Sequence, residues 1–577
     1  MKLRLSGTKA FFGVLVVLLS IAYLTWGYLT VSDYGLMWDA WEHYMGDRYL
    51  AFYTGLSQAP ITDTIEPLAI YQRDDHPHWD KVIDFLKGND VAEDPLLIWP
   101  LGPMVGALSK RVFWQWLGWF DFQDATHFGV IMVIGLFLPW LYLFAARRIG
   151  RWGGIMAVLW VSLHPRFFAH AHFNVKDPVE AVFFTGCIMM FLLAVERRSY
   201  QWMLGGGLMW GLALATKANA LFVPVILAPW FCMLLWRRRK LGEAMLTRNA
   251  WVALAVAPIF GISLMILLWP LMLVNLPSSL HTYIASLLSR GGGGTTGWQI
   301  WPFLHFIGTM PVAMLLLLLI GLSEMGWRSW RKRRIRPFDL LLISWLIIPI
   351  LRVSLPGAKD FDGIRHWLEV IPAAALIAGL GFQRIMRLIL LITRRSPKVY
   401  AKRLLVGLLL ALLFIQPAYS WIVANHPYQL VYFSPLVGRA SGAERLGFHD
   451  ATDYWANSYA LGFDWINEHT EHGAVVLVGV APHLTWFNRE IRMRADLNPL
   501  PTIGYAPEDV HNMIREHSQV AYLMYVTRKG WYEQIVRTYQ PISPVVHEVA
   551  VDGQVILLIL RIDASQDLPP ENQDISP

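Results

Sequence analysis

Long apolar runs separated by short basic loops are the feature that most constrains how this chain can fold. Eleven stretches carry almost no charge, and a helix of roughly twenty apolar residues crosses a hydrocarbon core of ~30 Å. We expect membrane helices near residues 11–31, 127–146, 153–171, 178–195, 201–217, 220–236, 250–274, 303–322, 338–355, 367–382 and 403–423. The first stretch is longer than a signal-peptide core and lacks a small-residue cleavage site, so we interpret it as an anchor.

The Lys and Arg residues gather in every second loop. They stand at residues 2–9, 147–151, 197–198, 237–248, 328–336 and 384–403. Because cytoplasmic loops of membrane proteins are enriched in Lys and Arg, we expect a cytoplasmic N-terminus and a tail outside the membrane. The apolar stretch 96–118 contains Pro100, Pro103 and Lys110, and we interpret it as a re-entrant or interfacial helix, since another span would invert the alternation.

Composition excludes several other classes of protein. The net charge of +7 would suit a nucleic-acid-binding protein, but the basic residues lie in short loops between apolar runs. The 28 Trp residues are typical of interfacial aromatic belts. The two cysteines, Cys187 and Cys232, both lie in apolar runs, which argues against a disulfide framework or a cysteine zinc site.

We expect two domains. Residues 1–423 form the membrane domain, with a first outer loop at about 32–126, and residues 424–577 form an extracytoplasmic C-terminal domain. That tail has a helical pattern at 460–469 and β-like runs at 474–480, 520–526 and 545–562, the last around an Asp552-Gly553 turn signal. We predict a mixed α/β domain whose last dozen residues are disordered. The chain has no Asn-x-Ser/Thr sequon, which favours a bacterial inner membrane over a glycosylating compartment.

The predicted topology gathers polar side chains on the outer face. They are Asp39, Glu42, Arg166, His170, His172, Asn174, Lys176, Asp177, Lys217, Lys359, Asp360, Asp362, Arg365 and His366. Ionisable residues close to membrane helices are costly and usually functional. Cations and carboxylates are interleaved in this set, as a phosphate-bearing substrate and an acid–base step would require.

Plainer interpretations of these residues remain open. Asp39 and Glu42 could solvate an interfacial helix, and Asp177 could cap the helix that continues with Pro178. Lys217 could extend to the membrane surface, and Arg365 with His366 could bind lipid head groups. His170 and His172 resemble a metal pair, but their i,i+2 spacing points them apart on a helix. The glycines at 291–294 resemble a phosphate-binding loop, although no strand or helix start flanks them, which favours a flexible loop.

Six stretches of the chain resemble one family. They are WDAWEHYMGDRYL, LHPRFFAHAHFNVKDPVEA, GLALATKANAL, FDGIRHWLEVIP, HPYQLVYFSPLVGRASGAER and DYWANS. In order and in common sidedness they resemble the protein O-mannosyltransferases and their bacterial relatives, the lipid A aminoarabinose transferases. The resemblance covers nearly the whole chain. It implies an integral-membrane glycosyltransferase of the C-type fold that uses a polyprenyl-phosphate sugar.

The resemblance also implies roles for individual residues. Asp39 matches the catalytic Asp, and Glu42 stands one turn beyond it where the family often has Asp-Glu and this chain has Asp39-Ala40. The donor phosphate would be bound by Lys217, Arg365, His366, Arg166 and Lys176. Asp177, Asn174 and Asp362 would orient these groups or the acceptor. No cofactor is required, and a divalent metal is not demanded, because the lipid phosphate already carries the leaving charge.

The implied reaction is inverting transfer of the sugar to an acceptor hydroxyl outside the membrane. The partners are a polyprenyl-phosphate-linked sugar, membrane lipids and an acceptor that is a protein, a lipid or a glycan; nucleic acid is not among them. One rival interpretation is a lipid or sugar transporter, or flippase, without transferase chemistry, and a third is a non-catalytic scaffold with an outer binding domain. Transporters commonly bind substrate at the bilayer midplane between inverted repeats, whereas here the charges lie at helix ends and no repeat is visible.

Overall fold

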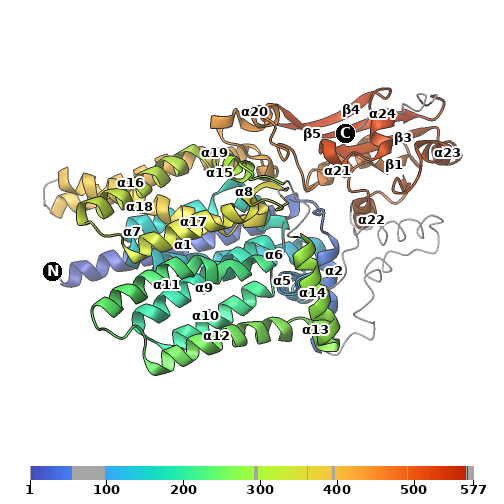
Figure 1. The fold of residues 1–577 in the computed structure, drawn as a ribbon. Coiled ribbons are helices and arrows are strands. Elements are labelled where there is room, and N and C mark those ends of the chain that lie inside the picture. The colour runs from blue at the N-terminus through green and yellow to red at the C-terminus, as the bar shows by residue number, and fades with distance from the viewer. Residues whose placement is uncertain are drawn as a thin grey trace. The chain divides into compact units, whose positions relative to one another are not determined.

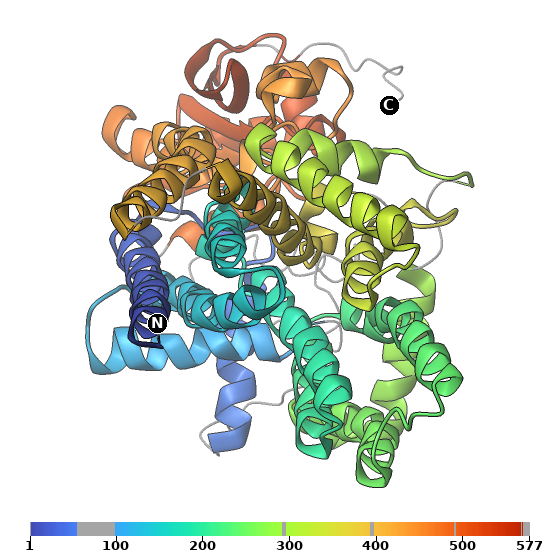
Figure 2. The ribbon, with the colours of Figure 1, turned by 90° about the vertical axis from the view of Figure 1, so that its left-hand side faces the viewer.

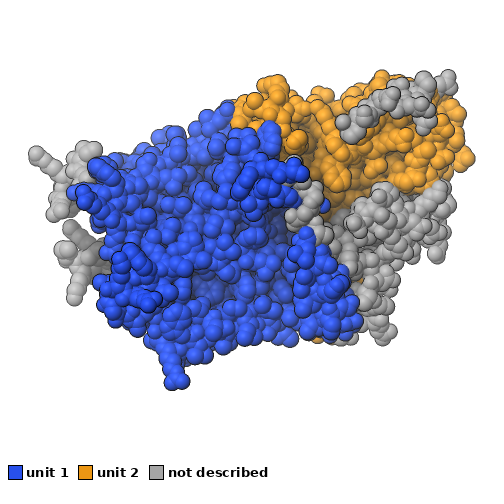
Figure 3. All heavy atoms as spheres, viewed as in Figure 1, with its two compact units in different colours: residues 1–31, 99–429, 434–436 blue, residues 32–98, 430–433, 437–577 orange. Residues whose placement is uncertain are grey.

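The described residues of the computed structural model are 2–54, 98–290, 296–359, 361–392, 397–489, 492–566 and 568. They form two compact units, coloured in Figure 3. Unit 1 contains residues 1–31, 99–429 and 434–436, and unit 2 contains residues 32–98, 430–433 and 437–577. The predicted first outer loop therefore belongs, from Ser32 to Ile98, to unit 2. The glycine run at 291–294, Asp360 and most of the last dozen residues lie outside the described residues.

Unit 1 is helical. Its helices run side by side in Figure 1, and Figure 2 looks along most of them. The α-helices are α1 (Lys2–Thr30), α5 (Leu101–Lys110), α6 (Phe122–Arg148), α7 (Arg151–Ser162), α8 (Pro165–Phe173), α9 (Asp177–Arg197), α10 (Tyr200–Leu214), α11 (Val223–Lys240), α12 (Arg248–Leu267), α13 (Pro270–Val274), α14 (Leu276–Arg290), α15 (Trp301–Thr309), α16 (Val312–Lys332), α17 (Pro337–Ser354), α18 (Val370–Ile392) and α19 (Pro397–Ala424). Short segments η3 (Arg111–Trp116), η4 (Ala218–Phe222) and η5 (Gly363–Trp367) connect them.

Within the described ranges, nine helices are long and apolar enough to cross a membrane. They cover residues 10–33, 122–148, 177–197, 218–240, 248–267, 312–332, 337–354, 370–389 and 403–424. Each overlaps a predicted span, which confirms the helical membrane fold. The other two predicted spans correspond to the 15-residue α10 and to the pair α7 and α8.

Three predicted spans are wrong as single helices, because each is interrupted at a proline. Residues 153–171 break before Pro165, residues 250–274 before Pro270, and residues 303–322 at Pro311. Proline lacks an N–H and its ring clashes with the preceding turn, so it fits the first turn of a new helix better than the middle of an old one. Helix α16 also continues to Lys332, so part of the predicted basic loop 328–336 is helical. Helix α14 was not predicted.

The stretch 96–118 forms α5, which continues directly into the π-helical η3. In Figure 2 this light-blue segment lies across the helices that point toward the viewer. Trp114, Trp116 and Trp119 at its end are exposed. Tryptophan favours the membrane–water boundary, so the exposed indoles favour the interfacial alternative, which stays a prediction.

The basic segments lie together at one end of unit 1. Arg148 at the end of α6 pairs with Glu196 at the end of α9, and Arg198 pairs with Glu243 just beyond α11 at 3.8 Å. Arg237 on α11 donates to the carbonyl of Ile335 at 2.6 Å. We call this the basic end. Because α9 and α10 cross unit 1, their other ends, at Asp177 and Lys217, lie on the opposite side.

Helices α16 and α18 approach each other closely through glycines. A Cβ atom at Gly381 would collide with the carbonyl oxygen of Leu317, and one at Gly321 would collide with that of Ile377. Small residues allow helix backbones in membranes to pack closely where the hydrophobic effect gives no drive for association.

We expect Gly381→Ala to destabilise unit 1, because overpacking typically costs about 1–3 kcal/mol. The measurement is the melting temperature of the purified protein in detergent. Gly326→Ala on α16 is the matched control, since a Cβ there would meet nothing within 4 Å. Equal melting temperatures for the two variants would contradict the close packing.

Unit 2 contains a five-stranded sheet in the order β2-β1-β3-β5-β4. Strand β1 (Val475–Val478) runs parallel to β2 (Asn498–Pro499) and β3 (Val520–Val526). Strand β5 (Gln554–Asp563) runs antiparallel to β3 and to β4 (Val545–Val551). The hairpin turns at Asp552 and Gly553, both with positive φ, as the Asp-Gly signal predicts. The predicted α/β tail is confirmed.

Unit 2 also contains helices. They are η1 (Val31–Asp33), α2 (Trp41–Thr54), η6 (Gln429–Val431), η7 (Pro435–Val437), α20 (Arg439–Arg445), α21 (Tyr459–His469), α22 (His483–Arg489), α23 (Pro507–His517), η8 (Lys529–Trp531) and α24 (Gln534–Tyr539), of which η1, η6 and η7 lie at the junctions between the units. The predicted helix at 460–469 is α21. Strand β1 is buried along its whole length, which fits its position inside the sheet.

Candidate active site

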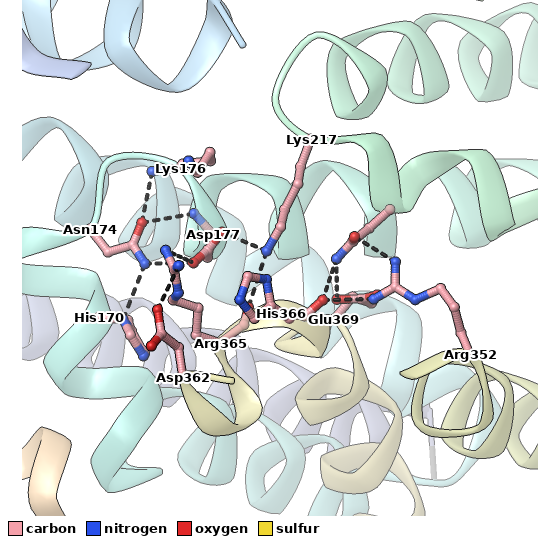
Figure 4. A network of polar contacts seen from close by, with 11 residues as sticks. His170, Asn174, Lys176, Asp177, Lys217, Arg352, Asp362, Arg365, His366 and Glu369 are labelled. Carbon is pink, nitrogen blue, oxygen red and sulfur yellow. Dashed lines mark hydrogen bonds and ion pairs between the residues drawn. The ribbon is translucent and has the colours of Figure 1, made fainter. Parts of the chain in front are cut away.

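A buried polar network lies at the end of unit 1 opposite the basic end (Figure 4). Its residues come from the loop before α9, the turn after α10 and the segment around η5. These segments are far apart in sequence, but each adjoins the end of a helix that crosses unit 1. The network brings together His170, Asn174, Lys176, Asp177, Lys217, Asp362, Arg365 and His366, all predicted as outer-face polar residues.

Asp177 and Lys217 form the centre of the network. The Lys217 ammonium lies 2.7 Å from Asp177 Oδ1 and also donates to the carbonyl of Arg365 at 3.2 Å. Asp177 is 1% exposed and Lys217 is 8% exposed. Lys217 therefore points into the protein rather than toward bulk water. Asp177 is the first residue of α9, and its side chain makes an ion pair rather than a helix cap.

Asn174 fixes the loop before α9. Its side-chain oxygen accepts from the backbone N–H groups of Lys176 and Asp177, each at 3.0 Å. Its amide nitrogen contacts Asp177 Oδ2 at 2.8 Å and His170 Nδ1 at 3.1 Å. One side chain therefore satisfies the N–H groups at the start of α9 and orients the central carboxylate.

Arg365 carries the second cation. Its guanidinium lies 2.7 Å from Asp362 and 4.0 Å from Asp177 Oδ2. Asp362 has a φ of 58°, a left-handed conformation that an Asp tolerates better than most residues, and it starts η5. The turn therefore aims Arg365 back at the Asp177–Lys217 pair.

The first turn of α5 joins two of these segments. The N–H of Leu101 donates to the carbonyl of Ala215 at 3.0 Å, two residues before Lys217. A Cβ atom at Gly102 would stand 2.5 Å from the carbonyl oxygen of Val175, next to Lys176. Only glycine allows this approach, so the start of α5 holds the two lysine-bearing loops at a fixed separation.

A second group of contacts extends the network and was missed by the sequence analysis. Arg352 donates to Asn219 Oδ1 at 2.5 Å and to the carbonyl of His366 at 2.7 Å, and lies 3.7 Å from Glu369. Asn219 also donates to the His366 carbonyl at 2.6 Å. These bonds fix the backbone around η5. The sequence did contain a feature that could have identified them, because Arg352 and Glu369 are ionisable residues inside predicted membrane helices.

The remaining residues predicted to bind the donor phosphate are Arg166, Lys176 and His366, which are buried or partly buried. Arg166 is fully buried on α8, one turn before His170, and Lys176 is 8% exposed. Burial, together with the charges of Arg365 and Lys217, holds the pKa of His366 well below its usual value. At neutral pH His366 would therefore offer a hydrogen bond rather than a positive charge.

The side chains of His170 and His172 contact different residues. His172 contacts the carbonyl of Phe168 at 2.7 Å and Thr30 at 3.2 Å, whereas His170 contacts Asn174. Among the residues that the structure describes, no group of three or more His, Cys, Asp or Glu side chains could hold a metal ion.

Asp39 and Glu42 belong to unit 2. Asp39 is partly exposed and stands in the turn that leads into α2, and Glu42 is buried in the first turn of that helix. The N–H of Glu42 donates to the carbonyl of Asp39 at 3.0 Å. The two carboxylates thus stand three residues apart in one short turn, as the sequence spacing predicts.

Comparison with known proteins gives one family match. The model of the dolichyl-phosphate-mannose-protein mannosyltransferases matches residues 120–262, a stretch that contains Arg166, Asp177 and Lys217. A comparison with curated proteins found no match.

Solved structures with similar chains include ArnT from Cupriavidus metallidurans bound to undecaprenyl phosphate, with 16% identity, coverage of 95% of this chain and 97% of that chain, and a TM-score of 0.46. The apo form of that protein shows 17% identity, coverage of 80% and 87%, and a TM-score of 0.40. The oligosaccharyltransferase of Archaeoglobus fulgidus shows 13% identity, coverage of 73% and 60%, and a TM-score of 0.41.

The family match confirms the resemblance predicted from the sequence: over residues 120–262 the chain is similar to the dolichyl-phosphate-mannose-protein mannosyltransferases, which are membrane glycosyltransferases.

Proposed function

We propose that this protein is a membrane glycosyltransferase that moves a sugar from a polyprenyl-phosphate donor to an acceptor hydroxyl, with inversion at the sugar carbon. The observation that carries the proposal is the buried network around Asp177 and Lys217, whose central ion pair lies inside the stretch that matches the mannosyltransferase family. The name of that family specifies a dolichyl-phosphate sugar, which is a polyprenyl-phosphate donor.

The network has the chemistry that a leaving phosphate requires. The predicted site residues include four cations, Lys176, Lys217, Arg365 and Arg166, and the carboxylates Asp177 and Asp362. The carboxylates hold two of the cations in place, at 2.7 Å in each case. Fixed cations stabilise the charge that builds on a leaving phosphate without reorganising during the reaction. Arg365 can bind phosphate through two N–H groups, whereas Lys217 acts as a point charge.

Asp39 is the proposed general base, and Glu42 is the candidate second carboxylate. Inverting transfer needs a base that removes the proton of the acceptor hydroxyl as the new bond forms. A positioned base contributes about 10² to 10⁴ in rate. Asn174, Asp177 and Asp362 act as orienting residues for the cations, and His366 supplies a neutral hydrogen-bonding group. The proposed chemistry requires no metal, because the donor phosphate leaves with its own charge.

The decisive experiment supplies a labelled polyprenyl-phosphate sugar to the purified protein in detergent. We expect release of polyprenyl phosphate and transfer of the label to envelope acceptor fractions. A transporter or flippase would bind the donor without breaking the sugar–phosphate bond. The label in the acceptor fraction, analysed by mass spectrometry, would also identify whether a protein, a lipid or a glycan receives the sugar.

The proposed reaction takes place outside the cytoplasm of a bacterial inner membrane. The basic end of unit 1 would face the cytoplasm and the network end would face outward. We expect reporter fusions after Lys240 and Arg334 to report the cytoplasm, and fusions after Asn425 to report the outside. A cytoplasmic signal from the Asn425 fusion would overturn the topology and the assignment of the reaction to the outer face.

A further inference from the structure

The segment directly before Asp39, residues 35–38, is held by residues of the C-terminal tail within unit 2. The N–H of Gly35 donates to Asn457 Oδ1 at 2.8 Å, and the N–H of Trp38 donates to the carbonyl of Trp455 at 3.1 Å. His483 Nε2 donates to the carbonyl of Trp38 at 2.8 Å. These contacts account for three backbone groups within four residues of the chain.

The Trp38 side chain is held as well. The guanidinium of Arg528 lies over its ring at 4.9 Å from the centroid, and the ring of Trp531 lies 5.2 Å away at 73°. Arg528 also contacts the Trp531 ring at 5.0 Å and donates to the carbonyl of Tyr454 at 2.9 Å. We call Trp455, Asn457, His483 and Arg528 the tail cluster.

Two members of the tail cluster lie in a segment that is fixed by its own hydrogen bonds. Trp455 and Asn457 belong to the DYWANS motif, residues 453–458, which the proposed chemistry leaves without a role. The buried Asp453 carboxylate accepts from the N–H groups of Ser458 at 2.5 Å and Trp455 at 3.4 Å. The motif thus folds on its own aspartate and presents one carbonyl and one amide oxygen to residues 35–38.

Two further observations show that the fit is specific. A Cβ atom at Gly35 would stand 2.7 Å from the carbonyl oxygen of Asn457, so no larger residue fits without displacement. Burial lowers the pKa of His483 to about 4, although the bond to Trp38 and the charge of Asp39 act in the opposite direction. His483 is therefore neutral at pH 7, and its Nε2 carries the proton that it donates.

Asp39 is thus fixed from both sides. The tail cluster holds residues 35–38 before it, and α2 begins two residues after it, with the Asp39 carbonyl already accepting from Glu42. Packing alone would need only apolar contacts, whereas here the backbone direction at Trp38 is set by hydrogen bonds on both its N–H and its carbonyl.

From this geometry we propose that the tail cluster positions the Asp39 carboxylate for catalysis, so that His483 and Arg528 are positioning residues that act through Trp38. The inference rests on the proposed function, in which Asp39 is the base. The proposal gives the C-terminal domain a part in the reaction, because its residues hold the backbone next to the base. A displacement of about 1 Å at a reacting group can cost about 10² in rate, so small changes in the cluster have measurable effects.

The test compares His483→Ala with His483→Gln in the full-length protein. The alanine variant loses the donor to Trp38, and we expect kcat to fall by about 10-fold to 100-fold with an unchanged KM for the donor. The glutamine variant places an N–H near the position of Nε2 and should recover most of the turnover. The matched control is His511→Gln, a buried histidine of the same unit that bonds Tyr539 instead and should leave turnover unchanged.

A double variant separates positioning from general damage. If His483 acts through Asp39, His483→Ala should cause no further loss in an Asp39→Asn background, because effects within one functional unit do not add. A further loss of the same size there would overturn the inference. If His483→Ala does not fold, Gly35→Ala replaces it, with the same expected fall in kcat and the same double variant.

The outcomes distinguish the two proposals. Normal turnover in Asp39→Asn would overturn the assignment of Asp39 as the base and the inference together, and normal turnover in Glu42→Gln as well would overturn the proposed function. Loss of turnover in Asp39→Asn with normal turnover in His483→Ala and Gly35→Ala would overturn the inference alone. Failure of His483→Gln to recover more than His483→Ala would also overturn it.

Discussion

We expect Asp39→Asn to lower turnover of a polyprenyl-phosphate sugar by at least about 10², with insertion and donor binding unchanged. The amide keeps the size and shape of the side chain but cannot accept the proton of an acceptor hydroxyl. The proposed donor cations belong to a different part of the chain, at residues 166–217 and 365. The measurement is kcat with saturating donor, together with the apparent KM for the donor.

Glu42→Gln is the internal control for Asp39→Asn. Glu42 stands one turn beyond Asp39 and is buried in α2, so its replacement tests whether the second carboxylate is the base. Normal turnover in Asp39→Asn with loss in Glu42→Gln would transfer the role to Glu42. Normal turnover in both variants would contradict a glycosyltransferase mechanism of this type.

The sequence predicts most of the fold because its signals are local. Charge-free runs of membrane length identify each spanning helix, and period-2 runs with an Asp-Gly turn identify the tail hairpin. The side on which each loop lies follows from the counts of Lys and Arg. That alternation also places Asp177, Lys217 and Arg365 at one end of the helical unit, where the structure finds them in contact.

Helix breaks could not be predicted from the prolines alone. Pro165, Pro270 and Pro311 each separate two helices, whereas other prolines remain inside α6, α11, α12, α17 and α19. In either case a proline removes one backbone hydrogen bond, and its ring clashes with the preceding turn of a continuous helix. Whether the chain bends or breaks depends on the tertiary contacts that satisfy the freed groups, and a single sequence does not contain those contacts.

Part of the site was not predicted for a similar reason. Arg352 and Glu369 lie within three residues of the ends of predicted helices, where a charge can simply face water. Their importance depends on pairing across different segments, at 3.7 Å, and on the bonds of Arg352 to Asn219 and to the carbonyl of His366. The contacts of the DYWANS motif with residues 35–38 are likewise separated by more than 400 residues and have no local signal.

We expect Lys217→Met to abolish transfer, with Asp177→Asn in the same chain unable to restore it. Removing one partner of a buried ion pair leaves an uncompensated charge, which typically costs about 3–5 kcal/mol of stability. Lys217→Met alone could therefore inactivate the protein by unfolding it. The double variant removes both charges of the 2.7 Å pair, and we expect it to recover the melting temperature.

Recovery of folding without recovery of transfer is the result expected if Lys217 binds the donor phosphate and Asp177 orients it. The matched control is the double variant Arg328→Met with Asp339→Asn, a comparably buried pair at the basic end with side chains 13% and 4% exposed. That variant removes one cation and one carboxylate from the same unit without touching the network, so it should keep normal transfer. Lys217→Arg should recover transfer poorly, because a planar guanidinium does not reproduce a compact ammonium. If the Lys217→Met, Asp177→Asn protein is both folded and active, Lys217 serves only to neutralise Asp177, and Arg365 becomes the principal cation for the donor phosphate.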